Sequence, residues 1–286
     1  MMKDNINIYI LMSASMILWA IAWTSAKIVN EYFTFYNLVF LRFGFGFIFL
    51  TPLISIKYFS KLNIKNLFNI FITSILFFIY NICFFKGTYY GLAGKGAILV
   101  TTINPIVTLI IISLINKKIN KNQILGMLFG FIGGIFILGI FNNGVNIILY
   151  KENYYFLTCA IIWGIITVLT KYGQKNLNSY LYIFLCYFIT TLISLAYIDF
   201  SNVKFSHLDN KFYIHFMIVS IGAMSFGTSV YMYSTKILGA VRSSAFIFSV
   251  PFIAIITSNL ILNEPITLNI IIGGFLSLFG VYLSNK

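Results

Sequence analysis

Charged residues are scarce in this sequence, and their scarcity excludes an ordinary soluble protein. Only 9% of the 286 residues are charged and 60% are hydrophobic. A soluble globular domain carries about 25% charged and 45–50% apolar residues. So few charges cannot cover a water-exposed surface, and lipid must therefore surround most of the chain. We predict a multi-pass membrane protein.

Cysteine and acidic residues are also few. Cys83, Cys159 and Cys186 lie far apart in apolar runs, without a CxxC pair, so neither a disulfide framework nor a metal site is predicted. None of the six acidic residues falls deep inside an apolar run. Proton-coupled carriers usually need a titratable group within the membrane. Coupling would therefore use a boundary residue such as Glu31 or Glu264, or transport is uncoupled.

The motifs of the competing functional classes are missing. The sequence has no HExxH, no paired intramembrane aspartates and no Ser/His pair, so no catalytic residue, metal or cofactor is predicted. Filter repeats typical of channels are not found either. The net charge of +13 comes from lysines between apolar runs, which favours contact with an anionic leaflet over nucleic-acid binding. An enzyme or a channel without a recognisable motif stays open as the alternative to a transporter.

Long apolar runs dominate the chain. A membrane-spanning helix needs about 20 mostly apolar residues, and backbone groups in lipid must pair within the segment, so such runs form helices. The predicted fold class is all-α, with ten transmembrane helices. These are expected at 6–29, 36–56, 66–87, 93–115, 121–141, 154–173, 179–198, 212–235, 240–262 and 267–284.

The distribution of basic residues predicts the orientation. Cytoplasmic loops carry an excess of Lys and Arg. With the N-terminus inside, twelve basic residues fall on the inner side and seven on the outer side. Because ten spans return the chain to its starting side, both termini are expected in the cytoplasm.

The sequence contains an internal repeat that relates residues 1–142 to residues 154–286, at offsets of 144, 146 and 147. Each half holds five predicted spans, so the second half enters the membrane inverted. Inverted repeats are typical of transporters, whose substrate site lies near mid-membrane between the halves. The glycine rows favour close helix packing. The matching positions are Trp19 and Trp163, Lys27 and Lys171, Pro105 and Pro251, Lys118 and Glu264, and the rows Gly126-x3-Gly130-x2-Gly133 and Gly273-x3-Ser277-x2-Gly280.

These residues, with Leu41-Arg42-Phe43, resemble the EamA-type ten-span family of the drug/metabolite transporter superfamily. The resemblance covers essentially the whole chain. It implies a basket-like ten-helix fold with a central cavity, and transport of amino acids or other small metabolites, often outward. One position departs from the family pattern, because Lys118 stands where an acidic residue is frequent.

Aromatic and amide side chains inside the spans are the candidates for a substrate-binding cavity. The tryptophans either pack against lipid or stack on a substrate, and the amides either join helices or contact the substrate. Pro105 and Pro251 either kink their helices or serve as hinges. The cavity candidates are Trp19, Trp23, Tyr80, Asn81, Asn104, Trp163, Tyr231 and Asn259.

Three charged residues are candidates for gating. Lys27 and Arg42 are placed near the outer ends of the first two spans, where they either snorkel to the interface or attract an anionic group; Glu264 follows the ninth span. The sequence thus predicts a secondary transporter for an amino acid or related solute, with export and a homodimer left open. An aromatic, amide-rich cavity suits a small zwitterion or a planar aromatic solute. The Ile-, Asn- and Lys-rich usage suggests a bacterial inner membrane.

Overall fold

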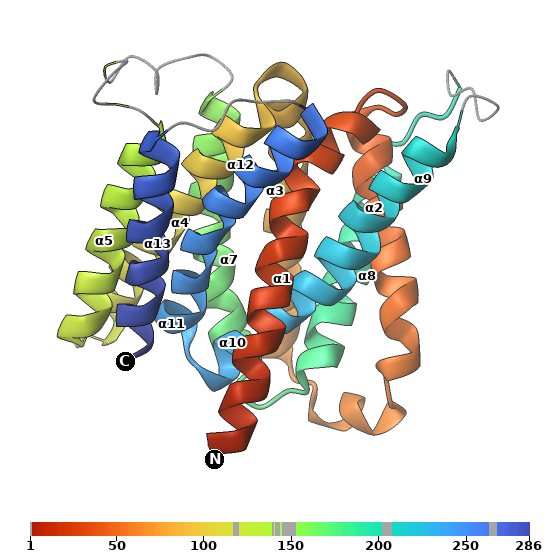
Figure 1. The fold of residues 1–286 in the computed structure, drawn as a ribbon. Helices are drawn as coiled ribbons and strands as arrows, with labels where there is room; N and C mark the ends of the chain where they lie inside the picture. The colour runs from red at the N-terminus through yellow and green to blue at the C-terminus, as the bar shows by residue number, and fades with distance from the viewer. Residues whose placement is uncertain are drawn as a thin grey trace.

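The chain forms a bundle of helices that cross the molecule from end to end (Figure 1). The computed structural model describes residues 2–116, 120–138, 140, 144, 153–201, 208–262 and 268–286, and its elements in these ranges are all helical. Seven helices in this part are long and apolar enough to cross a membrane. Two shorter apolar helices, Ser179–Leu195 and Ile271–Ser284, accompany them. The prediction of an all-α, multi-pass membrane protein is confirmed.

The first half consists of five helices that run alternately up and down (Figure 1). They are α1 (Met2–Val29), α2 (Phe35–Leu50), α3 (Ile64–Tyr90), α4 (Ala93–Asn116) and α5 (Lys121–Leu138). The predicted span 36–56 extends too far, because α2 ends at Leu50. Pro52 lacks the backbone N–H that a continued helix needs. The chain turns there through two short 3-10 helices, η1 (Thr51–Leu53) and η2 (Ile56–Lys61).

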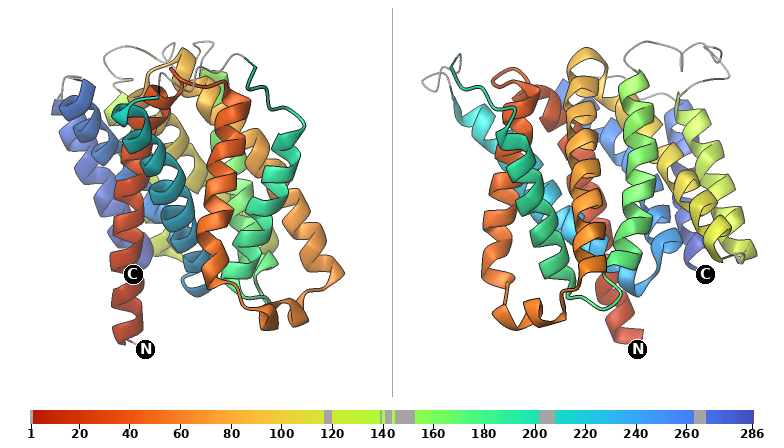
Figure 2. Two further views of the ribbon diagram at one scale, coloured as in Figure 1. Left: turned by 90° about the vertical axis from the view of Figure 1, so that its right-hand side faces the viewer. Right: turned by 180° about the vertical axis from the view of Figure 1, so that it is seen from behind.

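The second half repeats this pattern upside down (Figures 1 and 2). Two of its crossings change helix type along their length, with a π-helical stretch in the third and a 3-10 turn in the fourth. Both termini lie at the same end of the bundle (Figure 2). This arrangement agrees with the predicted inverted repeat. Its elements are α7 (Asn153–Gly173), α8 (Ser179–Leu195), α9 (Asn210–Met217) continued by η5 (Ile218–Thr228) and α10 (Ser229–Ile237), α11 (Ala240–Ala245) continued by η6 (Phe246–Ser249) and α12 (Val250–Leu262), and α13 (Leu268–Asn285).

The halves interlock instead of lying side by side. Helix α1 packs on η5 and α12 of the second half, while α7 packs on α3 and α4 of the first. One side-chain contact occurs in both halves. Asn30 Nδ2 donates to Phe85 O (3.0 Å), and Gln174 Nε2 donates to Met232 O (2.9 Å). The paired positions are 144 and 147 residues apart, the same offsets as the tryptophan pair and the glycine rows.

Helices α5 and α13 pack along each other through the glycine rows. A methyl group added at Gly133 would lie 2.6 Å from Gly273 O, and one added at Gly280 would lie 2.6 Å from Gly126 O. Small residues let transmembrane helix backbones approach this closely. The glycine rows therefore serve helix packing, as the sequence predicts.

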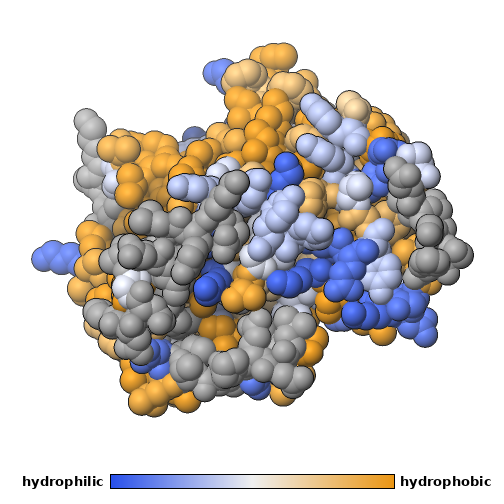
Figure 3. Space-filling model, turned by 90° about the horizontal axis from the view of Figure 1, so that it is seen from above, coloured by the Kyte–Doolittle hydropathy of each residue, from blue (hydrophilic) through white to orange (hydrophobic). Residues whose placement is uncertain are grey.

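Large hydrophobic side chains project from the outside of the bundle. Ile10, Leu114, Leu260 and Phe275 are each more than half exposed. Seen from above, hydrophilic side chains gather on part of the end face and hydrophobic side chains surround them (Figure 3). This distribution suits a protein whose flanks face lipid tails.

Candidate functional site

A cavity lies between the two halves, at the middle of the helices that line it. Helices α1, α2, α3 and α4 of the first half and α7, η5 and η6 of the second contribute side chains. Six of the predicted candidates meet there, namely Trp19, Trp23, Arg42, Tyr80, Asn104 and Trp163. The remaining lining residues are Ala22, Phe84, Val100, Thr101, Ala223, Met224, Thr228 and Ile247.

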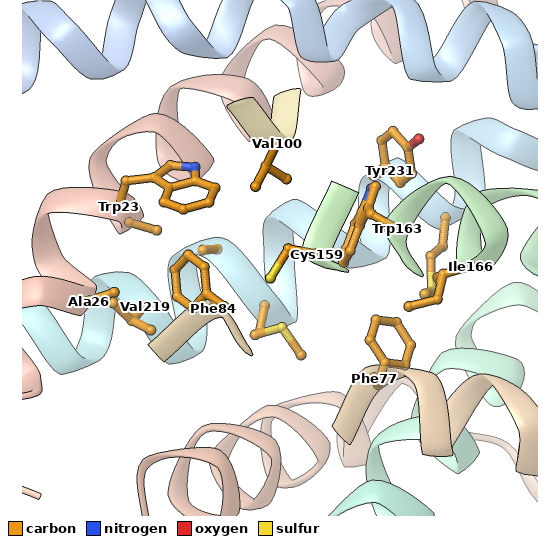
Figure 4. Close-up of a cluster of buried hydrophobic side chains, with 14 of the residues drawn as sticks. Trp23, Ala26, Phe77, Phe84, Val100, Cys159, Trp163, Ile166, Val219 and Tyr231 are labelled. Atoms are coloured by element: carbon orange, nitrogen blue, oxygen red, sulfur yellow. The ribbon is translucent and has the colours of Figure 1, made fainter. Parts of the chain in front are cut away.

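Aromatic rings form one wall of this cavity. The rings of Trp19 and Trp163 meet edge to face, with centroids 5.0 Å apart and planes at 87°. Tyr80 lies 4.8 Å from Trp163, and Tyr231 packs behind the tryptophans, 4.9 Å from Trp19. Trp163 lies between Tyr231 and Phe77 (Figure 4). The tryptophan pair from the sequence repeat thus lines the cavity and does not face lipid.

A second aromatic group lies on α1 and α3. Trp23 and Phe84 meet edge to face, with ring centroids 4.8 Å apart (Figure 4). Both side chains are nearly fully buried. Aromatic pairs prefer edge-to-face or offset contact over a face-to-face sandwich. The cavity therefore offers flat, preformed apolar surfaces on two sides.

Among the described residues, Arg42 is the one cation that lines the cavity. Its side chain is buried; Nε donates to Val219 O (3.1 Å) and Nη1 donates to Asn81 Oδ1 (2.6 Å). The guanidinium lies over the ring of Phe84, 5.0 Å from its centroid. It does not snorkel, so the expected position near the outer end of α2 is corrected. Arg42 lies near the middle of α2, where α3 and η5 cover its side chain.

No carboxylate in the described part of the chain pairs with Arg42. Moving an unpaired charge out of water costs several kcal/mol, and a guanidinium cannot lose its proton to avoid that cost. The guanidinium carries five N–H donors. Its hydrogen bonds to Val219 O and Asn81 Oδ1 use two of them. Donors therefore remain for an anionic group that enters the cavity.

Asn104 also has unused hydrogen-bonding capacity. Its side chain lines the cavity and is 2% exposed, and Oδ1 has no hydrogen-bond partner among the described residues. A buried amide oxygen without a partner costs about 1–3 kcal/mol. A ligand that donates to this oxygen would remove that cost.

The two prolines interrupt the regular helical hydrogen bonding beside the cavity. A helical proline lacks the N–H that would bond to the carbonyl four residues earlier. For Pro105 this carbonyl belongs to Thr101, and for Pro251 it belongs to Ile247; both residues line the cavity. The Ile247 carbonyl accepts instead from the backbone N–H of Val250. The backbone also departs from α-helical geometry just before Pro251, in the 3-10 turn η6.

The π-helix η5 adds further polar groups to the same region. Ala223 O accepts from Trp19 Nε1 and from Thr228 Oγ1, at 3.0 Å each. π-helical stretches are rare and are frequently found at functional sites. The corresponding α3 of the first half is a regular α-helix. The two walls of the cavity are thus not chemically equivalent.

The other candidates lie away from the cavity surface. Asn81 lies behind Arg42 and accepts its hydrogen bond. Lys27 Nζ donates to Gly91 O (2.8 Å) at the end of α3, where a cation also suits the helix dipole. Asn259 is on α12 outside the lining, and Glu264 is outside the described residues.

Sequence reasoning did not select several lining residues. Thr101 and Thr228 are polar residues within apolar spans, which is a signal that could have found them. Ala223 and Met224 carry no such signal, because small and apolar residues fill every span. They reach the cavity because η5 is placed there by its contacts with α1 and α2.

Comparisons with known proteins agree with this architecture. The EamA-like transporter family matches residues 6–139 and 151–286. An uncharacterized transporter of Archaeoglobus fulgidus is 23% identical over 96% of this chain and 97% of its own length. The uncharacterized transporter YyaM of Bacillus subtilis is 27% identical over 97% of this chain and 93% of its own.

The fold also resembles a solved one. A crystal structure of a protein with 14% sequence identity superimposes with a TM-score of 0.70, covering 97% of this chain and 96% of the other. That likeness shows the fold alone. The family match spans both halves of the chain, and the family is one of transporters and not of enzymes. The chain therefore belongs to the EamA-like transporter family.

Proposed function

We propose that this transporter carries a small solute with a carboxylate group, an amino acid or a related metabolite, through the cavity between its halves. The observation that supports this is Arg42, a buried guanidinium at the cavity that no carboxylate of the described chain neutralises. Arg binds carboxylates through two parallel N–H···O bonds. A substrate carboxylate would therefore compensate the buried charge while it is bound.

The cavity also has a group that can bind the ammonium group of an amino acid. Asn104 Oδ1 lines the cavity without a partner among the described residues and can accept from an ammonium group. The faces of Trp19 and Trp163 attract cations and provide flat apolar surface for a side chain. Together these groups match a zwitterion better than a simple anion.

The cavity is narrow in this conformation, which supports transport by alternating access. About 40 Å³ of it is open to the centre of a water-sized molecule. One water needs about 10–15 Å³ by that measure, and a site for a small molecule encloses about 300–1,000 Å³. The halves must therefore move apart to admit a solute. Inverted halves that exchange conformations would open the cavity to each side in turn. We propose a bacterial inner membrane as the location of the protein.

A reconstituted transport assay tests this function. The purified protein in proteoliposomes is given amino acids, their deaminated carboxylates and their decarboxylated amines. We expect saturable counterflow of at least one amino acid, competition by its deaminated form and none by its amine. Equal competition by the amine would contradict recognition of the carboxylate. Non-saturable flux would indicate a channel, and conversion to a new product would indicate an enzyme.

Replacing Asn104 with leucine should separate the two ends of the substrate. Hydrogen bonds to charged groups contribute about 1.5–3 kcal/mol, so affinity for the amino acid should fall about ten- to hundredfold. Affinity for the deaminated analogue should not change, because it has no ammonium group. Inhibition constants for both compounds in the counterflow assay provide the measurement. An equal loss for both would show that Asn104 only shapes the cavity.

A further inference from the structure

A second pocket is lined by elements that lie at the end of the bundle where both termini emerge (Figure 1). Its volume is about 690 Å³, and it is separate from the cavity between the halves. The α2–α3 connection of the first half forms one side, and the α7–α8 connection and the end of α10 form the other. Its lining residues are Lys57, Tyr58, Lys61, Lys175, Asn176, Leu177, Asn178 and Lys236.

The pocket is strongly basic. Four of its eight lining residues are lysines, and no lining residue is acidic. Lys236 Nζ donates to Leu177 O (2.9 Å), which holds the end of α10 against the α7–α8 connection. All four lysines are exposed. Four like charges around one hollow repel each other and favour an anionic occupant.

The short helix η2 carries apolar side chains beside these lysines. Residues three apart share a face of a 3-10 helix. Tyr58 and Lys61 therefore share the pocket face, while Ile56 and Phe59 share another and are 89% and 40% exposed. Such a segment places cations against a headgroup and apolar side chains among acyl chains, as interfacial helices do. A phosphate ion in water would use the lysines only.

We propose that this pocket binds the phosphate headgroup of an anionic phospholipid. The lipid would lie between Lys57 and Lys61 of the first half and Lys175 and Lys236 of the second. It would thereby join the two halves at this end of the bundle and stabilise the present conformation. Charge complementarity selects an anionic headgroup over a zwitterionic one, and the apolar face of η2 selects a lipid over a soluble phosphate.

Lipid titration of the purified full-length protein in neutral detergent tests the proposal. We expect phosphatidylglycerol to raise the melting temperature saturably and to remain bound in native mass spectra. Phosphatidylcholine and inorganic phosphate should do neither at equal concentration. Equal stabilisation by phosphatidylcholine would overturn the need for an anionic headgroup. Equal stabilisation by inorganic phosphate would overturn the lipid as the occupant.

Matched lysine variants then locate the effect. The triple variant Lys57→Gln, Lys61→Gln and Lys175→Gln should bind phosphatidylglycerol on the order of a hundredfold more weakly, at about fivefold per lysine. The control Lys65→Gln, Lys121→Gln and Lys286→Gln removes the same charge from residues outside the lining. It should retain the affinity to within a few-fold. An equal loss in both would show that diffuse surface charge attracts the lipid and would overturn the pocket.

Discussion

Replacing Arg42 with glutamine is expected to abolish transport of carboxylate solutes while leaving the protein folded. The substitution removes the one cation found among the described residues that line the cavity, and it keeps a side chain that can still donate to Asn81. Removing one partner of a buried charge pair costs about 3–5 kcal/mol, so substrate affinity should fall by a factor of about 150 or more. Direct binding measurements and counterflow in proteoliposomes provide the test.

Stability measurements distinguish a binding role of Arg42 from a structural one. Without substrate the guanidinium is buried unpaired, so glutamine should leave the melting temperature unchanged or raise it. Lysine at this position keeps the charge but loses the planar fork that reaches Val219 and Asn81, so transport should be only partly restored.

A charge control completes this test. Lys86→Gln removes a charge from α3 outside the cavity lining and should transport as the wild type does. Full transport by Arg42→Gln would contradict the proposed substrate class. A large drop in its melting temperature would instead indicate that Arg42 mainly holds α2 against α3 and η5.

Alanine at Gly133 and Gly280 together is expected to prevent α5 and α13 from packing. Each added methyl group would lie 2.6 Å from a backbone oxygen of the facing helix. Backbone atoms cannot rotate away, so the helices must separate, and overpacking typically costs about 1–3 kcal/mol per site. The double variant should melt at a markedly lower temperature and lose the sharp elution peak of the wild type.

Gly44 provides the matched control for these glycines. A methyl group there would lie 3.8 Å from Thr191 Cγ2, which is ordinary contact. Because alanine favours a helix over glycine by about 1 kcal/mol, Gly44→Ala should fold as well as the wild type or slightly better. If Gly44→Ala lowers the melting temperature as much as the double variant does, close backbone contact would not explain the glycine rows. A preference for glycine in helices within lipid would explain them instead.

The sequence reveals the repeat because its signals are carried by residue type and spacing. Prolines, glycines and tryptophans at nearly constant offsets predict two related halves, and five spans per half predict their inversion. The Asn30 and Gln174 contacts follow the same register, although an asparagine matched to a glutamine is not visible as a repeat. The family match over both halves agrees with this reading.

Arg42 illustrates what spacing cannot show. Its distance along the sequence from the start of the second span suggested that the side chain could reach the interface. Whether an arginine snorkels depends on which face of the helix it occupies and on what packs against that face. In the structure α3 and η5 cover it and supply its two acceptors.

The sequence by itself therefore determined that lipid surrounds this protein, that its fold is all-helical and that it consists of two related halves. These follow from hydrophobicity and from the need of backbone groups in lipid to pair within each segment. Tertiary structure alone decided which polar groups meet in the cavity, where η5 departs from α-helical geometry and which lysines share a pocket. Those outcomes depend on contacts between helices of opposite halves, which are more than a hundred residues apart in the chain and leave no local pattern to read.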